Sequence, residues 1–165
     1  NKYSETFKVP EPLIKEFGAR IMSLQNPISK MSKSDSDENA FILILDDKDA
    51  IRRKIKRAVT DSLGVVQYTD EQPGLKNLLN IYSVFSSEDI ATIVKRYEGL
   101  GYGKLKEDLA EIVVNGLDPI QKKYRELMDN KNYLEKVYRD GAEKAEYHAR
   151  RTLSKVYKKV GFIPR

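Results

Sequence analysis

The sequence predicts a mainly α-helical protein, in which one short strand and a polar loop precede a bundle of helices. Apolar residues in 104–128 recur every three or four positions, which is typical of a helix with one buried face. A second pattern of this kind covers about 131–160. The strand is predicted at 19–24, where a short apolar run lies between Gly18 and the Asn26-Pro27 turn.

Composition limits the class of protein and its partners. The 165 residues are 40% apolar and 33% charged, and no stretch approaches the roughly 18 apolar residues of a membrane span. The absence of cysteine excludes disulfides and thiolate metal sites, which suits a soluble protein of the cytoplasm. The net charge is +5, and its basic excess lies wholly in residues 104–165. That excess is typical of a polyanion-binding segment and equally of solvated helices.

The first half of the bundle is predicted from caps and apolar stripes. The run 41–45 is too short to assign by periodicity, and we expect an extended or single-turn segment. Helices follow at 46–59 and 75–85. A third helix is expected to start at Ser86 as its N-cap, and the glycines at 99, 101 and 103 are expected to end it.

The second half holds the two longest patterns. Gly116 and Asp118-Pro119 predict a kink or a break within 104–128. The last helix should bury a face that includes Gly141, Ala145 and His148. His148 is the only histidine, and its place on that face favours a packed side chain over a catalytic one.

The polar loop from Lys30 to Asp35 is the strongest candidate site. Two lysines three residues apart alternate with Ser32 and Ser34, so that ammonium groups and small hydroxyls share one short segment. Such groups can bind polyphosphate oxygens. The other interpretation is an ordinary exposed turn, because the same residues are common in turns.

The wording of this loop, KMSKS at residues 30–34, resembles the signature of class I aminoacyl-tRNA synthetases. Further blocks resemble bacterial tryptophanyl-tRNA synthetases in the same order along nearly the whole chain. They read GARIMSL at 18–24, KIK at 54–56, AVTDS at 58–62, PGLKNLLNIYS at 73–83, YEG at 97–99 and GAEKA at 141–145. The chain is therefore identified as a C-terminal half of that family, which begins just before the loop.

The resemblance implies a fold with two domains of different function. Residues 1–45 would be the C-terminal edge of a Rossmann-like catalytic domain that is otherwise absent, and residues 46–165 a helical bundle of the anticodon-binding type. The last helix, about 131–160, is thought in relatives to pack back on the catalytic domain. The whole enzyme would be a cytoplasmic homodimer, with its tryptophan pocket and paired-histidine signature in the missing half.

The resemblance also implies a reaction and site residues. Such enzymes react tryptophan with ATP, bound with Mg²⁺, to form tryptophanyl-adenylate and pyrophosphate. They then transfer the amino acid from the adenylate to tRNA(Trp). Lys30 and Lys33 would stabilise the departing pyrophosphate, with Ser32 and Ser34 as further contacts. Met31 and Ile21 would flank the adenine. No residues of this chain are predicted to bind a metal directly, and the chain alone is expected not to form the adenylate.

Basic residues of the helices are candidate contacts for tRNA. Those on the first helix and the last helix are Arg52, Arg53, Lys56, Arg150, Arg151 and Lys155. Solvated helix faces explain the same pattern. One departure from the family lies at the end of the loop, where Ser36 replaces a frequent proline.

Two other identities are weighed against this one. A tyrosyl-tRNA synthetase fragment shares the loop, but the blocks after Pro73 match the tryptophan enzyme, and 104–165 shows no β-rich RNA-binding domain. A non-catalytic helical RNA-binding or scaffold protein would explain the basic C-terminal third, and would leave the KMSKS loop as a coincidence.

Overall fold

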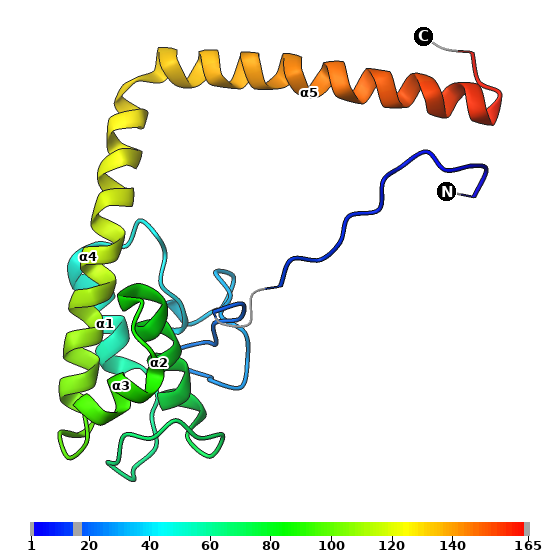
Figure 1. Ribbon diagram of the computed structural model, residues 1–165. Coiled ribbons are helices and arrows are strands. Elements are labelled where there is room, and N and C mark those ends of the chain that lie inside the picture. The colour runs from blue at the N-terminus through cyan, green and yellow to red at the C-terminus, as the bar shows by residue number, and fades with distance from the viewer. Residues whose placement is uncertain (1, 15–17, 164–165) are drawn as a thin grey trace. The chain divides into compact units, whose positions relative to one another are not determined.

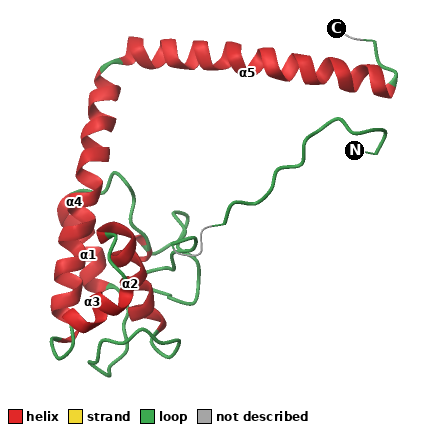
Figure 2. Ribbon diagram, viewed as in Figure 1, coloured by secondary structure: helices red, strands yellow, loops and turns green. Residues whose placement is uncertain are grey.

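The computed structural model describes residues 2–14 and 18–163. The chain divides into two compact units, one made of Asn1–Leu13 and Tyr124–Arg165 and the other of Ile14–Lys123. The described residues contain five α-helices, one 3-10 helix and no strand, so the predicted mainly α class is confirmed (Figure 2). The proposed division near residue 45 concerns the whole enzyme and stays a prediction.

The larger unit, Ile14–Lys123, contains most of the helices (Figure 1). In chain order these are η1 (Glu38–Ala40), α1 (Lys48–Arg57), α2 (Pro73–Ser86), α3 (Ile90–Arg96) and the first part of α4 (Gly101–Asp129). Helix α2 packs against α3, and α1 packs against η1. The predicted helices at 46–59 and 75–85 are therefore present with slightly different ends.

Carboxylate caps explain where α1 and α3 begin. The side chain of Asp47 accepts a hydrogen bond from the Ala50 amide at the start of α1. Asp89 caps α3 in the same way through the Thr92 amide. The prediction that Ser86 caps α3 is wrong, because Ser86 is the last residue of α2 and the chain then turns at Ser87 with a positive φ of 60°.

Helix α4 is continuous, so the predicted break near Pro119 is wrong. Its buried face continues past Gly116 to Leu117 and Gln121, and packing along that face compensates for the hydrogen bond that Pro119 cannot donate. The Phe85 ring lies where a side chain at Gly116 would be. Of the three glycines expected to end α3, only Gly99 lies in the turn, while Gly101 and Gly103 begin α4.

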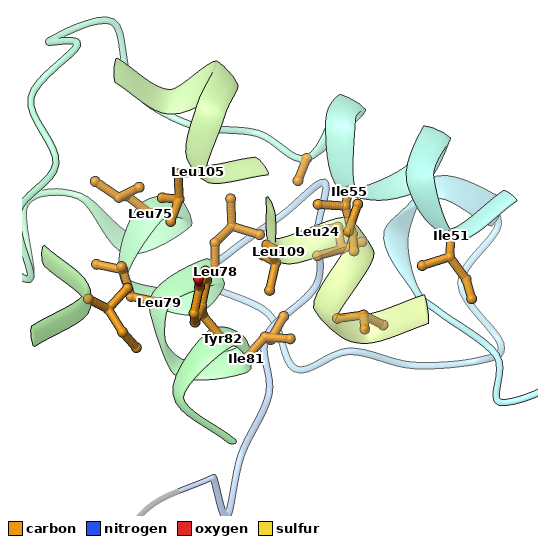
Figure 3. Packing of buried hydrophobic residues seen from close by; sticks show 14 of the residues in the cluster. Leu24, Ile51, Ile55, Leu75, Leu78, Leu79, Ile81, Tyr82, Leu105 and Leu109 are labelled. Atoms are coloured by element: carbon orange, nitrogen blue, oxygen red, sulfur yellow. The ribbon is translucent and has the colours of Figure 1, made fainter. Parts of the chain in front are cut away.

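The core of this unit joins α1, α2 and α4 to the segment before the polar loop (Figure 3). Leu24 comes from that segment and is 2% exposed. The labelled side chains around it come from the three helices and point toward one another: Ile51, Ile55, Leu75, Leu78, Leu79, Ile81, Tyr82, Leu105 and Leu109. The segment that leads to the polar loop is thus part of the helical core.

Two buried polar side chains fix the segment that follows the polar loop. Lys54 of α1 is 5% exposed, donates to Asp46 Oδ2 at 2.6 Å and lies over the Phe41 ring. Gln121 of α4 donates to the carbonyls of Ile44 and Asp46 at 2.8 and 2.9 Å. Residues 41–45 are extended with one turn, as predicted, and these polar contacts anchor the segment together with the buried Phe41.

The other unit contains α5 (Lys131–Val160), which Asn130 caps at its start and Gly161 at its end. The predicted helix is present, but none of its described residues is buried. The expectation of a packed His148 is wrong here, since its ring is exposed and meets only the edge of Tyr147 at 5.4 Å. At the far end, Lys159 Nζ donates to the Glu5 carbonyl at 2.6 Å. Across the described residues, no helix combines the length and the apolar character that a membrane crossing demands.

Gly74 is predicted to be the least replaceable glycine of the larger unit. A Cβ there would lie 2.2 Å from the Val59 carbonyl oxygen, which is backbone and cannot rotate away. Gly74→Ala should therefore lower the free energy of unfolding by about 1–3 kcal/mol in urea denaturation. Gly103→Ala is the control, because nothing lies within 4 Å of that position, and equal losses for the two variants would contradict the prediction.

Lys54 is predicted to stabilise the segment after the loop. Lys54→Met leaves the Asp46 carboxylate, whose side chain is 13% exposed, without its cation. Loss of one partner of a buried ion pair generally costs about 3 kcal/mol, and we expect a loss of this size on denaturation. Lys48→Met on the same helix should change stability little, since the Lys48 side chain is 58% exposed.

Candidate functional site

The polar loop, Lys30–Asp35, starts from a short antiparallel pairing. The Ser23 amide donates to the Ser29 carbonyl at 2.8 Å, and the Met31 amide donates to the Ile21 carbonyl at 3.0 Å. Between these bonds Met22 faces Lys30 in a single β-bridge. The predicted strand at 19–24 is thus wrong as a strand, because the described residues supply only this one bridge to pair with it.

The outer edge of Met22 is held by a side chain that sequence reasoning missed. Asn77 of α2 accepts from the Met22 amide at 2.9 Å and donates to the Met22 carbonyl at 2.8 Å. Asn77 is 3% exposed and lies one helical turn before the buried Ile81. A polar residue on an apolar helix face was therefore the signal that could have identified it.

The two lysines of the loop are exposed cations without a carboxylate partner among the described residues. Lys30 and Lys33 are exposed, and no carboxylate forms an ion pair with either one anywhere in the described ranges. Both sit within a segment whose two ends are fixed to the helices. The arrangement leaves both cations open to a polyanion.

The serines and the end of the loop are organised by local hydrogen bonds. Ser32 Oγ and Ser34 Oγ lie 3.0 Å apart, and the Asp35 amide donates to the Ser32 carbonyl at 3.2 Å. Asp37 then caps η1 by accepting from the Asn39 amide at 2.8 Å. The two hydroxyls that were predicted as phosphate contacts are thus exposed but bonded to each other.

Ile21 and Met31 come together beside the loop, as their predicted shared role requires. Both are half-buried and line one apolar cavity of about 220 Å³. Its other walls come from the segment after the loop, from α2 and from α4, and include Ile42, Ile81, Val84, Phe85, Val113 and Leu117. A flat apolar group could contact these walls, and the assignment of Ile21 and Met31 to adenine stays a prediction.

The basic residues of α1 differ in their availability. Arg52 binds both carboxylate oxygens of Glu111, at 2.6 and 3.0 Å, and this hydrogen-bonded pairing raises the pKa of Arg52. Arg53 and Lys56 are exposed, and neither makes an ion pair within the part of the chain that the structure describes. Lys56 shares a cleft of about 570 Å³ with Lys106, whose pKa is lowered by burial.

The basic residues of α5 are all on exposed surface. Arg150 pairs with Glu146 at 2.6 Å, one turn earlier on the same helix. Arg151 and Lys155 have no ion-pair partner among the described residues. The structure therefore brings together the loop residues and those of α1 within one unit, and it leaves those of α5 in the other.

A metal ion has no evident ligand set in the described part of the chain. No three carboxylate, imidazole or thiol side chains gather there in a way that could hold one. The donors at the loop are ammonium groups and hydroxyls, which suit the phosphates of a nucleotide.

Asp37 gives the end of the loop a predicted dependence on pH. Hydrogen bonds from the Asn39 amide and side chain hold the pKa of the Asp37 carboxyl below its ordinary value. A lowered folded pKa means that the cap is complete above the unfolded value of about 3.9 and is lost as the pH falls through the folded value. The Asn39 amide resonance should therefore stay constant from pH 8 to about 5 and move only in strong acid. Asp37→Asn should remove this movement, and an unchanged titration in that variant would contradict the assignment.

Comparisons with known proteins agree with the loop and the helices together. A family model described as tRNA synthetases class I (W and Y) matches residues 1–118. The tryptophan--tRNA ligase of Clostridium tetani is 53% identical over 163 residues, which are 99% of this chain and 48% of that protein. The tryptophanyl-tRNA synthetase of Mycoplasma pneumoniae has a similar structure, with a TM-score of 0.84, 28% identity, and 98% and 49% coverage of the two chains.

A structure from Campylobacter jejuni, described as a tryptophanyl-tRNA synthetase complexed with ADP and tryptophan, matches with a TM-score of 0.68 and 29% identity. The match covers 98% of this chain and 49% of the Campylobacter jejuni chain. The chain thus spans about half the length of the relatives that it matches. The matched residues include both the KMSKS loop and the helices that hold it. The chain belongs to the class I tRNA synthetases of the tryptophan and tyrosine group.

Proposed function

We propose that this chain is the C-terminal part of a tryptophan--tRNA ligase and supplies its KMSKS loop and helices for tRNA. The whole enzyme activates tryptophan with ATP, bound with Mg²⁺, and transfers it from the adenylate to tRNA(Trp). The observation that carries this proposal is the pair of unpartnered ammonium groups, Lys30 and Lys33, on a loop with both ends fixed. Curated relatives named tryptophan--tRNA ligase support the choice of amino acid over tyrosine.

The chemistry of the loop follows from electrostatics. Attack of the tryptophan carboxylate on the α-phosphorus expels pyrophosphate, and negative charge grows on the leaving oxygens. The Lys30 and Lys33 ammonium groups stabilise that charge when the loop closes over the nucleotide. Because neither cation is paired with a carboxylate of the described chain, no existing ion pair has to break first.

The nucleotide is expected to contact the loop from two sides. Its phosphates meet the lysines together with Ser32 and Ser34, and its adenine packs against Ile21 and Met31. The two serines rotate away from their mutual hydrogen bond at little cost, since both are exposed. The tryptophan pocket lies in the other half of a homodimeric, cytoplasmic enzyme.

Basic helix residues serve tRNA in this proposal. Arg53 and Lys56 on α1, and Arg151 and Lys155 on α5, are exposed cations that phosphates can approach. Arg52 and Arg150 already bind Glu111 and Glu146, so their contribution to tRNA binding is smaller. A non-catalytic RNA-binding protein would bind tRNA through the same residues, and it would not bind ATP.

Lys33 is predicted to act in the activation step. In a full-length ligase that carries this chain as its C-terminal half, Lys33→Gln should lower kcat of tryptophan-dependent pyrophosphate exchange by about a hundredfold or more. Lys30→Gln should have the same direction. The exposed Lys95 has no ion pair among described residues, and Lys95→Gln should leave the rate unchanged.

An exchange rate that survives replacement of both loop lysines would contradict the proposed function. The 165-residue chain by itself should show no exchange, because the paired-histidine signature and tryptophan pocket are expected in the other half. Salt-dependent binding of tRNA in the absence of any ATP-dependent reaction of the full-length protein would instead support the non-catalytic alternative.

A further inference from the structure

Asn77 differs from the other buried polar side chains in what it holds. The carboxamide oxygen and nitrogen of Asn77 both form hydrogen bonds with one residue, Met22, which lies 55 positions earlier in the chain. The side chain is almost completely buried, so these bonds are shielded from water. A helix side chain thus takes the place that a neighbouring strand would occupy.

The pairing geometry shows why this contact reaches the loop. In the antiparallel pair, Met22 and Lys30 face each other between two hydrogen bonds, so the amide and carbonyl of Met22 point away from Lys30. Asn77 binds those outward groups. Met22 is therefore held from both sides, by the bridged segment that carries Lys30 and by α2.

Helix α2 is itself firmly placed, which makes it a reference for the loop. Leu75, Leu78 and Leu79 on either side of Asn77 are at most 1% exposed. The start of the helix packs on the backbone at Val59, whose amide donates to the Leu24 carbonyl at 2.7 Å. The same helix is thus linked to the segment before the loop directly through Asn77 and indirectly through Val59.

We propose that Asn77 is a positioning residue for the KMSKS loop, which sets where Lys30 and Met31 lie relative to the helices. The proposal rests on the proposed function of the loop. Asn77 does not touch the nucleotide, and it acts through Met22. A shift of α2 would be passed through this carboxamide to Met22 and across its β-bridge to Lys30, so the helical unit and the start of the loop move together at this point.

The test changes the carboxamide with little change of shape. Asn77→Asp keeps the acceptor for the Met22 amide and places a carboxylate oxygen against the Met22 carbonyl. Gln72→Glu is the matched control. Gln72 is 2% exposed and donates to the Val65 carbonyl and to the Tyr102 hydroxyl of α4, neither of which belongs to the polar loop, so it reports the general cost of such a change.

Two measurements separate positioning from simple stability. In the full-length ligase, Asn77→Asp should raise KM for ATP or lower kcat of pyrophosphate exchange by about tenfold, the effect of one lost hydrogen bond. Gln72→Glu should leave both within about twofold. In the 165-residue chain, the amides of Ser23 and Met31 should exchange with solvent about tenfold faster in Asn77→Asp and at the original rate in Gln72→Glu.

The outcomes are distinct. If Asn77→Asp changes neither the amide-proton exchange of Ser23 and Met31 nor the ATP kinetics of the full-length ligase, the positioning role is overturned. This holds even if Lys33→Gln abolishes activity. Equal kinetic effects of Asn77→Asp and Gln72→Glu would also overturn it, because they would show only a loss of stability. If the Asp variant does not fold, Asn77→Ser replaces it, since a serine side chain is too short to reach both groups of Met22. If Lys33→Gln leaves pyrophosphate exchange unchanged, the proposed function of the loop is contradicted instead.

Discussion

The structure depends on buried polar contacts between helices and the two ends of a loop, which no sheet supports in the described ranges. Asn77 holds the segment before the loop, and Lys54 with Gln121 holds the segment after it. A buried carboxamide or ammonium group costs free energy unless its hydrogen bonds are made, so each of these contacts favours a single arrangement of the chain. The loop is thereby fixed to the helices at its ends, while Ser32 and Ser34 in its middle are held by local hydrogen bonds.

This arrangement matches the demands of charge stabilisation. Lysines that develop contacts only with a leaving group must be available and must also be close to their final place before the reaction. The exposed Lys30 and Lys33 meet the first condition, and the anchored ends of the loop meet the second. A loop with equally free ends would lose more conformational entropy on closing over a nucleotide.

Local sequence signals predicted the helices well and predicted their limits less well. The apolar stripes located α2 and α4 because a buried helix face repeats along the chain, and the stripe of α5 also predicted a helix although none of its described residues is buried. Pro119 did not break α4, because buried residues on both sides of it keep the helix in the core. The cap of α3 moved from Ser86 to Asp89, since both residue types are good caps and the turn at Ser87 decides between them.

The site was only half visible in the sequence. The KMSKS motif can be recognised from the sequence alone. The proximity of Ile21 and Met31, which line one cavity, was expected from the resemblance to the family. Asn77, Lys54 and Gln121 were missed, because their partners lie 8 to 77 residues away and periodicity carries no information on such contacts. His148 shows the reverse error, in which a helical stripe suggested burial that the described unit does not supply.

Helix α2 holds the segment before the loop through the buried carboxamide of Asn77. The most direct measurement is the NMR signal of the Asn77 side-chain amide protons in the 165-residue chain. The account predicts slow exchange with water and close contacts to the backbone of Met22. Rapid exchange at the rate of an exposed asparagine, with no contact to Met22, would contradict it.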